Sequence, residues 1–394
     1  MDIKQFIFLK SKVSEANPEI QKDTDRFIKD LNISSIPFDG KVFFISSGGT
    51  EEIFVKIYKD YEPPFYIIAT DSDNSLPAAL EIVSFLNNKH IENYLFHGTP
   101  DVVREALKEK SKDIIEFNYE FKSNPELLKG MRLGVVGKPS DWLIASIMDY
   151  DVVKAKTGAT MIDISFNEFK DTIEDSAPIG FEALKDKINH RIDASELKLA
   201  LRIYSALKTL VSRYKLDGLS VRCFDLLGTI HSTSCIALSL LNNEGIISSC
   251  EGDLPALISM MILKKYFNEL SFQCNPSYID VKKNMGYFAH CTIPTNMCEN
   301  FVLDTHFESG IGVGIHGELH KGEVTVLKVN SDLAKFSCYS AKIEDNMYKS
   351  NLCRTQIKVQ FHDPINQVLT SPCGNHLIFA YGDLKEKLLA LLAK

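Results

Sequence analysis

The feature that most constrains the fold is a repeated alternation of short apolar strands with helices in the N-terminal part of the chain. The strand-like stretches are residues 41–47 (KVFFISS), 65–70 (FYIIAT) and 93–97 (NYLFH). Helical stretches lie near residues 51–58, 77–87 and 101–110. Continuous apolar strands are typical of sheets covered on both faces, and strands joined by helices pair in parallel. The pattern therefore predicts a parallel α/β domain.

A second α/β unit begins with RLGVVG at residues 132–137, a strand that ends in glycine. Further strands are predicted at residues 152–157, 161–165, 218–223 and 246–249. Helices are predicted at residues 142–148, 194–214, 234–241 and 254–267. This order again favours a parallel sheet flanked by helices.

The pattern changes after about residue 272. Residues 323–329 (EVTVLKV) and 355–361 (TQIKVQF) alternate between apolar and polar side chains, and residues 336–343 are also strand-like. A period of two is typical of antiparallel sheet with one buried face, so we expect a small barrel here. Residues 384–394 are expected to close the chain as an amphipathic helix.

The predicted fold class is α/β, with two Rossmann-like parallel α/β domains followed by a C-terminal antiparallel β-barrel-like domain. With 394 residues, the chain is too long for one ordinary core. We place the domains at residues 1–129, 130–272 and 273–394, with the polar residues 118–129 as the first boundary.

Composition limits the classes of partner that the protein is expected to bind. The net charge is -8 and no basic run occurs, which argues against nucleic acid or an anionic membrane. The N-terminal MDIKQFIFLKSKVSE lacks a signal-peptide core, and the longest apolar run, residues 254–263, is about half of a membrane span. We therefore expect a cytoplasmic protein.

All nine cysteines lie between Cys223 and Cys373 at irregular spacings, which favours reduced, mostly buried thiols.

Carboxylates mark the second unit as the candidate site. Asp225 follows a predicted strand, at the edge of the sheet where α/β proteins bind ligands. Asp253 lies at the start of the apolar helix predicted at residues 254–267, and Glu251 serves as an alternative to it. Each aspartate also fits a helix-capping role, and one side chain can both cap a helix and bind a metal.

Three histidines accompany these carboxylates in the C-terminal part: His290 in FAHC, His306 in DTHFESG, and His376 in GNHL. A lone histidine is usually structural, but one imidazole with two carboxylates suits Mn²⁺, Co²⁺ or Fe²⁺ better than Mg²⁺. Trp142, the only tryptophan, is a candidate to line a sugar site or to pack an interface. Arg354 is a candidate to bind a substrate oxygen or to form a surface ion pair.

Residues 222–263 resemble the L-fucose isomerase and L-arabinose isomerase superfamily. The resemblance is carried by Cys223-Phe224-Asp225, by residues 235–243, and by Cys250-Glu251-Gly252-Asp253 before an apolar helix. It extends to residues 132–157, which are similar to the opening of the family's second domain. It also includes His290 and the Gly374-Asn375-His376 motif, which are similar to histidine motifs of the family.

The resemblance implies a metal-dependent aldose–ketose isomerase that works through an ene-diol. It implies Asp225 and Asp253 as metal ligands and acid/base groups, His376 as a metal ligand, and Mn²⁺ as the metal. His290 is then expected to bind the metal or to contact a monosaccharide, and Arg354, Trp142 and Glu251 are expected to contact the monosaccharide. A trimer or hexamer is implied as well. The family's glutamate is replaced by Asp225, so a sugar-binding protein that retains the fold without catalysis is the alternative function.

Overall fold

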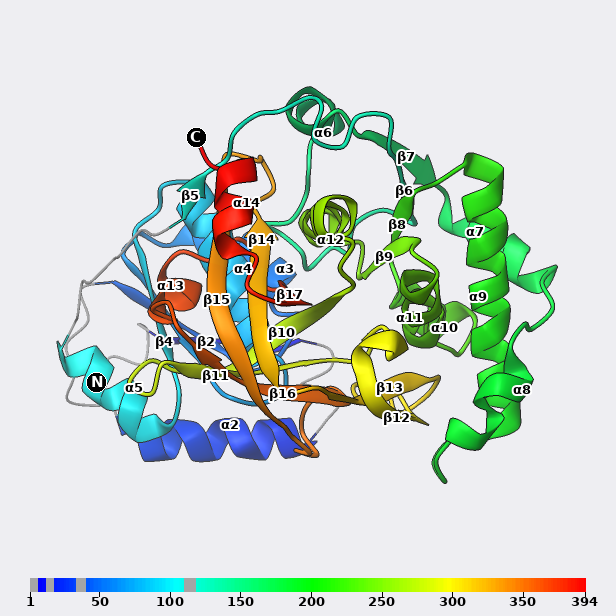
Figure 1. Ribbon diagram of the computed structural model, residues 1–394. Coiled ribbons are helices and arrows are strands. Elements are labelled where there is room, and N and C mark those ends of the chain that lie inside the picture. The colour runs from blue at the N-terminus through cyan, green and yellow to red at the C-terminus, as the bar shows by residue number, and fades with distance from the viewer. Residues whose placement is uncertain (1–5, 12–17, 33–39, 110–117) are drawn as a thin grey trace.

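The computed structural model describes residues 6–11, 18–32, 40–109 and 118–394 (Figure 1). Part of the N-terminal segment considered for a signal peptide, residues 1–5 and 12–15, lies outside this description. The N-terminal unit is a parallel sheet in the order β1-β2-β3-β4. Its strands are β1 (Phe6–Leu9), β2 (Lys41–Ile45), β3 (Phe65–Ala69) and β4 (Asn93–His97). Its helices are α2 (Pro18–Leu31), α3 (Glu51–Ile57), α4 (Ser75–Asn88) and α5 (Pro100–Glu109).

Both faces of this sheet are buried, as its continuous apolar strands predict. Successive side chains of a strand point to opposite faces. Val42 and Phe44 of β2 accordingly pack in one apolar cluster with residues of α2 and α5. Phe43 and Ile45 pack in another cluster that includes Phe54 of α3 and much of α4. The sheet is therefore the middle layer of a three-layer sandwich.

The second unit is a parallel sheet in the order β7-β6-β8-β9. Its strands are β6 (Arg132–Val136), β7 (Thr160–Ile164), β8 (Gly218–Val221) and β9 (Ile247–Cys250). Its helices are α6 (Tyr150–Thr157), α7 (Phe166–Glu174), α8 (Phe181–Leu184), α9 (Ala194–Tyr214), α10 (Asp225–Thr229), α11 (Cys235–Asn243) and α12 (Leu254–Phe267). The predicted helices at 194–214 and 254–267 are confirmed at both ends.

Two predicted elements of this unit are wrong. Residues 152–157 form the helix α6 rather than a strand. Asp149 caps this helix by accepting from the backbone N–H groups of Asp151 and Val152, and Gly158 ends it at φ 81°. Residues 142–148 form turns instead of a helix. Glu81 of α4 accepts hydrogen bonds there from the Ala145 backbone N–H and the Ser146 hydroxyl, which holds the segment in a non-helical path.

The C-terminal part contains a closed antiparallel barrel, as predicted. Its order is β14-β17-β10-β11-β16-β15, and pairing of β14 with β15 closes it. The strands are β10 (Ser271–Asp280), β11 (Met285–His290), β14 (Gly322–Val329), β15 (Lys335–Asn346), β16 (Thr355–Phe361) and β17 (Leu377–Tyr381). The ribbon of β12 (Cys298–Asp304) and β13 (Gly314–Leu319) lies beside the barrel, with helices α13 (Asn366–Thr370) and α14 (Lys385–Leu392) (Figure 1).

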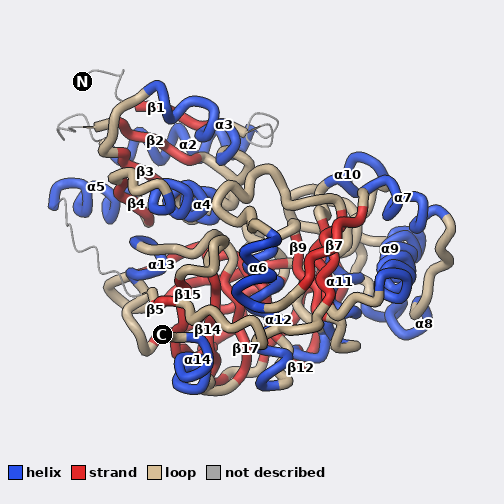
Figure 2. Tube along the Cα trace, turned by 90° about the horizontal axis from the view of Figure 1, so that it is seen from above, coloured by secondary structure: helices blue, strands red, loops and turns tan. Residues whose placement is uncertain are grey.

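The N-terminal unit, the second unit and the barrel pack against one another. The short strand β5 (Tyr119–Glu120) pairs with β15, so this part of the predicted first boundary lies against the barrel. Figure 2 shows the N-terminal unit, the second unit and the barrel meeting around a common centre. One apolar cluster includes Leu80 of α4, Val221 of β8 and Phe288 of β11. The domain boundaries themselves stay predictions.

All nine cysteines are free, and every one except Cys298 is buried. Their burial agrees with the expectation of reduced thiols in a core. Among the described residues, none of the helices has the length and apolar character needed to cross a membrane.

Candidate metal centre

The site is built on the tight turn that joins β9 to α12. Glu251 and Gly252 both have left-handed backbones, with φ values of 63° and 72°. A Cβ atom at position 252 would lie 2.6 Å from the Cα atom of Pro139, so only glycine fits between the turn and the neighbouring loop. The Ser140 backbone N–H also donates to the Glu251 carbonyl over 3.1 Å. These contacts fix the direction of the Glu251 side chain.

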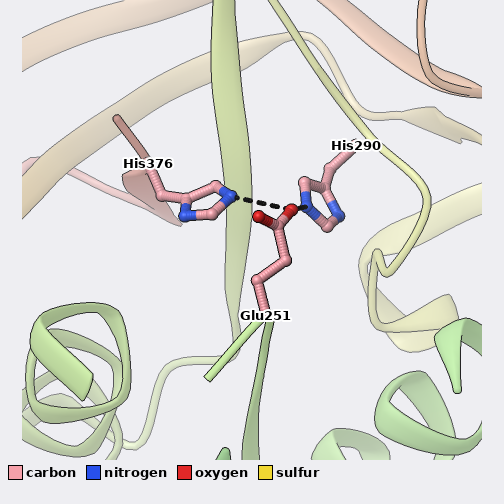
Figure 3. Close-up of side chains that lie close together, drawn as sticks. All are labelled: Glu251, His290 and His376. Carbon is pink, nitrogen blue, oxygen red and sulfur yellow. Dashed lines mark ion pairs between the residues drawn. The ribbon is translucent and has the colours of Figure 1, made fainter. Parts of the chain in front are cut away.

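Three side chains from distant parts of the sequence converge at this turn (Figure 3). The Oε1 atom of Glu251 lies 3.5 Å from Nε2 of His290 and 3.4 Å from Nε2 of His376. The three prospective ligand atoms all lie within 4.8 Å of one another. Two imidazoles and one carboxylate form a donor set that suits a divalent transition metal.

A buried nitrogen supports this interpretation. Nε2 of His376 is fully buried and makes no hydrogen bond of good geometry among the described residues; its polar neighbour is Oε1 of Glu251, 3.4 Å away. A buried polar atom with only such a loose contact is costly unless a ligand satisfies it. A cation placed between His376 and Glu251 would satisfy both groups. The residues present therefore fit a metal.

The remaining polar atoms of these side chains are held by neighbours. Nδ1 of His290 lies 2.9 Å from the hydroxyl of Thr292, and Nδ1 of His376 lies 2.8 Å from Oδ2 of Asp253. The indole N–H of Trp142 donates to Oε2 of Glu251 over 2.8 Å. Such partners orient metal ligands and direct their free atoms toward the ion.

Asp253 is occupied by three partners. Its Oδ1 atom accepts from the Ala256 backbone N–H over 2.7 Å and thereby caps α12. Its Oδ2 atom accepts from Nζ of Lys328 over 2.6 Å and also contacts His376. Burial alone would raise the pKa of Asp253, but the charge of Lys328 and the contact with His376 lower it to about 2. Asp253 is therefore ionised and lies behind His376.

In the metal-free site, Glu251 and His376 stabilise each other's charged forms. Burial alone would raise the pKa of Glu251, but the charge of His376 and the close contacts with both imidazoles hold this pKa well below its usual value. Burial alone would lower the pKa of His376, but the charge of Glu251 and the contact with Asp253 raise it to about 9. In the metal-free protein His376 is therefore protonated at neutral pH, so a metal must displace its proton.

A pocket opens beside these ligands. Its lining combines apolar and thiol-bearing side chains with polar and charged ones. Its lining residues are Asn74, Cys223, Phe224, Leu227, Thr233, Cys235, Cys250, Glu251, Asn275, His290, Cys291, His306, Glu308 and Cys353. Glu308 is exposed to solvent, and the surrounding protein together with the nearby charge of Glu251 raises its pKa. Burial lowers the pKa of His306 to about 4, so this imidazole is neutral.

The structure does not bring Asp225 to this group of ligands. The Asp225 carboxylate accepts from Nε of Arg222, at 2.9 Å and 3.0 Å, at the start of α10. Arg354 also points elsewhere: its Nε atom donates to the Thr305 carbonyl over 2.7 Å and lies 3.7 Å from Asp304. Glu251, Trp142, His290, Asp253 and His376 do lie together, with Glu251 rather than Asp253 facing both imidazoles.

Sequence reasoning gave no functional role to Glu308, Thr292 or Lys328. Glu308 had one signal, its position two residues after His306 in DTHFESG. Lys328 lies in an alternating strand sequence, where a lysine is normally expected on the exposed face, yet its side chain is fully buried. Only the packing of the barrel against the second unit reveals its partner Asp253.

Comparison with known proteins gives relatives of one kind. Sulfoquinovose isomerases from Priestia aryabhattai and Priestia megaterium are each 25% identical over 365 residues, which covers 86% of this chain and 80% of the relative. A sulfoquinovose isomerase from Alkalicoccus urumqiensis is 22% identical over 294 residues, covering 72% of this chain and 65% of the relative. No family model matches the chain. These relatives support the expectation that the chain is an isomerase enzyme that acts on a sugar.

Proposed function

We propose that the chain is a divalent-metal-dependent aldose–ketose isomerase of a monosaccharide. The observation that carries the proposal is the convergence of Glu251, His290 and His376 at one edge of a pocket. Two nitrogen donors and one carboxylate suit Mn²⁺, Fe²⁺ or Co²⁺, and we propose Mn²⁺. The sugar isomerase relatives and the resemblance to the L-fucose and L-arabinose isomerases support the same reaction class.

In this proposal Glu251, His290 and His376 hold the metal. When bound, the metal polarises the sugar's carbonyl and stabilises negative charge on the neighbouring oxygens. Asp253 and Thr292 keep the two imidazoles in the orientation that directs Nε2 toward the site. Trp142 fixes the second oxygen of Glu251. The apolar wall around Phe224 and Leu227 limits the access of water to the reacting carbons.

The substrate proposal follows the relatives. Sulfoquinovose is the first sugar that we propose as a substrate, because the relatives are named for it. Pentoses and 6-deoxyhexoses follow, on the resemblance to the L-fucose and L-arabinose isomerases. A cytoplasmic location and a homotrimer or homohexamer belong to the same proposal.

The first test is metal content followed by turnover. Elemental analysis of the purified protein is expected to give a metal content near one ion per chain. With added Mn²⁺, ketose is expected from at least one sugar in a panel of sulfoquinovose, L-fucose, L-arabinose, D-arabinose and L-rhamnose, measured by NMR. Absence of metal and of conversion, together with retained sugar binding, would favour the alternative function, a non-catalytic sugar-binding protein.

Glu251→Gln tests the ligand assignment. This variant removes the charge of Glu251 and keeps its shape. It is expected to lower Mn²⁺ affinity by more than about 100-fold, because loss of a residue that only orients a ligand typically costs about 10- to 100-fold. Isothermal titration of the chelator-treated protein measures this. Glu244→Gln is the matched control, because Glu244 forms a partly exposed ion pair with Lys208 at the end of α11. Equal Mn²⁺ affinity of the two variants would contradict the assignment.

A further inference from the structure

Isomerisation through an ene-diol requires a group that carries a proton between two adjacent carbons. A carboxylate performs this task only if its oxygens are free to approach the sugar. Asp253 is fully buried and held by Lys328, His376 and the start of α12. Asp225 is paired with Arg222 outside the pocket lining. Glu251 faces two imidazoles as a prospective metal ligand. Each of these three carboxylates is therefore engaged elsewhere.

Glu308 is different. It lies in the loop between β12 and β13 and lines the same pocket as Glu251, His290 and His306. Its Oε1 atom accepts a hydrogen bond from the side-chain amide of Asn74, which directly precedes α4 of the N-terminal unit. No ion pair of Glu308 with a lysine or arginine is found in the part of the chain that the structure describes. Asn74 thus positions the carboxylate at the pocket wall without neutralising its charge.

We propose that Glu308 is the catalytic residue that transfers the proton between C1 and C2 of the sugar; this role rests on the proposed isomerase function. The carboxylate takes the proton from C2, and the electrons of the C2–H bond form the C1=C2 double bond of an ene-diol. The carbonyl bond opens onto O1, which then takes the proton of the O2 hydroxyl. Glu308 returns its proton to C1, while O2, now without its proton, becomes the ketose carbonyl. Atoms and charge balance without an external reactant.

The surroundings of Glu308 suit this role. Its side chain is exposed to solvent and lines the pocket, so its oxygens are accessible to a sugar there. The surrounding protein and the nearby charge of Glu251 raise its pKa, and the hydrogen bond from Asn74 opposes them. A raised pKa brings a carboxylate closer to the working pH, where proton transfer in both directions is most effective.

Glu308→Gln is the central test, made on the full-length protein loaded with Mn²⁺. The variant is expected to lose about 10²- to 10⁴-fold in kcat, the usual contribution of a general acid or base. Its Mn²⁺ affinity is expected to stay within about twofold, because Glu308 is not among the converging ligands. In D₂O, the wild type is expected to incorporate deuterium at C2 of recovered aldose, whereas the variant is expected to show none.

Two further variants complete the design. Glu308→Asp is expected to restore part of the exchange, because it keeps a carboxylate on a shorter side chain. Glu299→Gln is the matched control: Glu299 lies at the start of β12, the strand that leads into the same loop, and is paired with His320 at the surface. It is expected to keep wild-type turnover and exchange.

The outcomes separate this inference from the function on which it rests. Full turnover and deuterium exchange in Glu308→Gln would overturn the role of Glu308 and leave the isomerase standing. A large loss of Mn²⁺ affinity in Glu308→Gln would also overturn it, since Glu308 would then be a ligand. A wild-type protein that isomerises no sugar of the panel would remove the proposed function and this role with it.

Discussion

At the scale of single residues, two aspartates of similar sequence context have different surroundings. Asp253 is fully buried between Lys328 and His376, whereas the side chain of Asp225 is 37% exposed and pairs with Arg222. Removing one partner of a buried ion pair leaves the other charge uncompensated, whereas Arg222 would keep its ion pair with Asp141, at 2.6 Å, if the partly exposed Asp225 lost its charge. The two positions should therefore respond very differently to the same substitution.

Asp253→Asn is expected to lower the free energy of unfolding by about 3–5 kcal/mol, because Lys328 is left buried without its counter-charge. It is also expected to weaken Mn²⁺ binding about 10- to 100-fold, because His376 loses the partner that orients it. Urea denaturation and metal titration measure the two effects.

Asp225→Asn provides the comparison. Its expected cost in unfolding free energy is below about 1 kcal/mol. Because the carboxylate lies outside the converging ligands, its Mn²⁺ affinity is expected to stay near that of the wild type. Loss of metal in this variant would instead support the role that the family resemblance gives to Asp225.

At the scale of elements, the turn between β9 and α12 decides where Glu251 points. Gly252→Ala is expected to lower the free energy of unfolding by about 1–3 kcal/mol, because φ is 72° and the new Cβ would lie 2.6 Å from Pro139. Relief of that clash must move Glu251, so Mn²⁺ affinity is expected to fall as well.

Gly228→Ala is the control for this turn. Gly228 lies in α10, and a Cβ there would meet no atom within 4 Å. Alanine in a helix is favoured over glycine by about 1 kcal/mol, so stability should be unchanged or slightly higher. If both alanine variants keep wild-type stability and metal affinity, the strained turn does not position Glu251.

Local signals explain which elements could be predicted from the sequence. The helix α9 begins with a capping box formed by Asp193 and Glu196, and α12 begins with Asp253 and a proline in its first turn. Both helices match their predicted ends. In α6 the paired valines suggested a strand, although the capping Asp149 and the terminal Gly158 favoured a helix. Capping signals were more informative there than β-propensity.

At the scale of the whole molecule, one buried carboxylate joins the three regions. Glu81 of α4 accepts hydrogen bonds from Ala145 and Ser146 of the second unit and from the Asn375 backbone N–H beside His376. The position of His376 therefore depends on the packing of the N-terminal unit. This dependence makes the charge state of His376 a property of the assembled fold.

The folded structure raises the pKa of His376 from an ordinary value near 6.5 to about 9. Its protonated form therefore stabilises the metal-free fold fully below about pH 6.5, and this contribution is lost as pH rises through about 9. Thermal unfolding with a chelator should show that decline. Mn²⁺ affinity should change in the opposite direction and rise with pH toward 9, because fewer chains carry the proton that the metal displaces.

The sequence by itself determined the alternation of strands and helices and the change to a barrel, and it named most residues that the structure brings together at the candidate site: Glu251, Asp253, His290, His376 and Trp142. These follow from local periodicity, capping and short motifs, which depend on neighbours in the chain. Only the tertiary structure decided the roles within that set. Which carboxylate faces the imidazoles, which one pairs with Lys328, and how Asn74 meets Glu308 depend on contacts between residues far apart in sequence. Those distances are fixed by packing, and no local pattern encodes them.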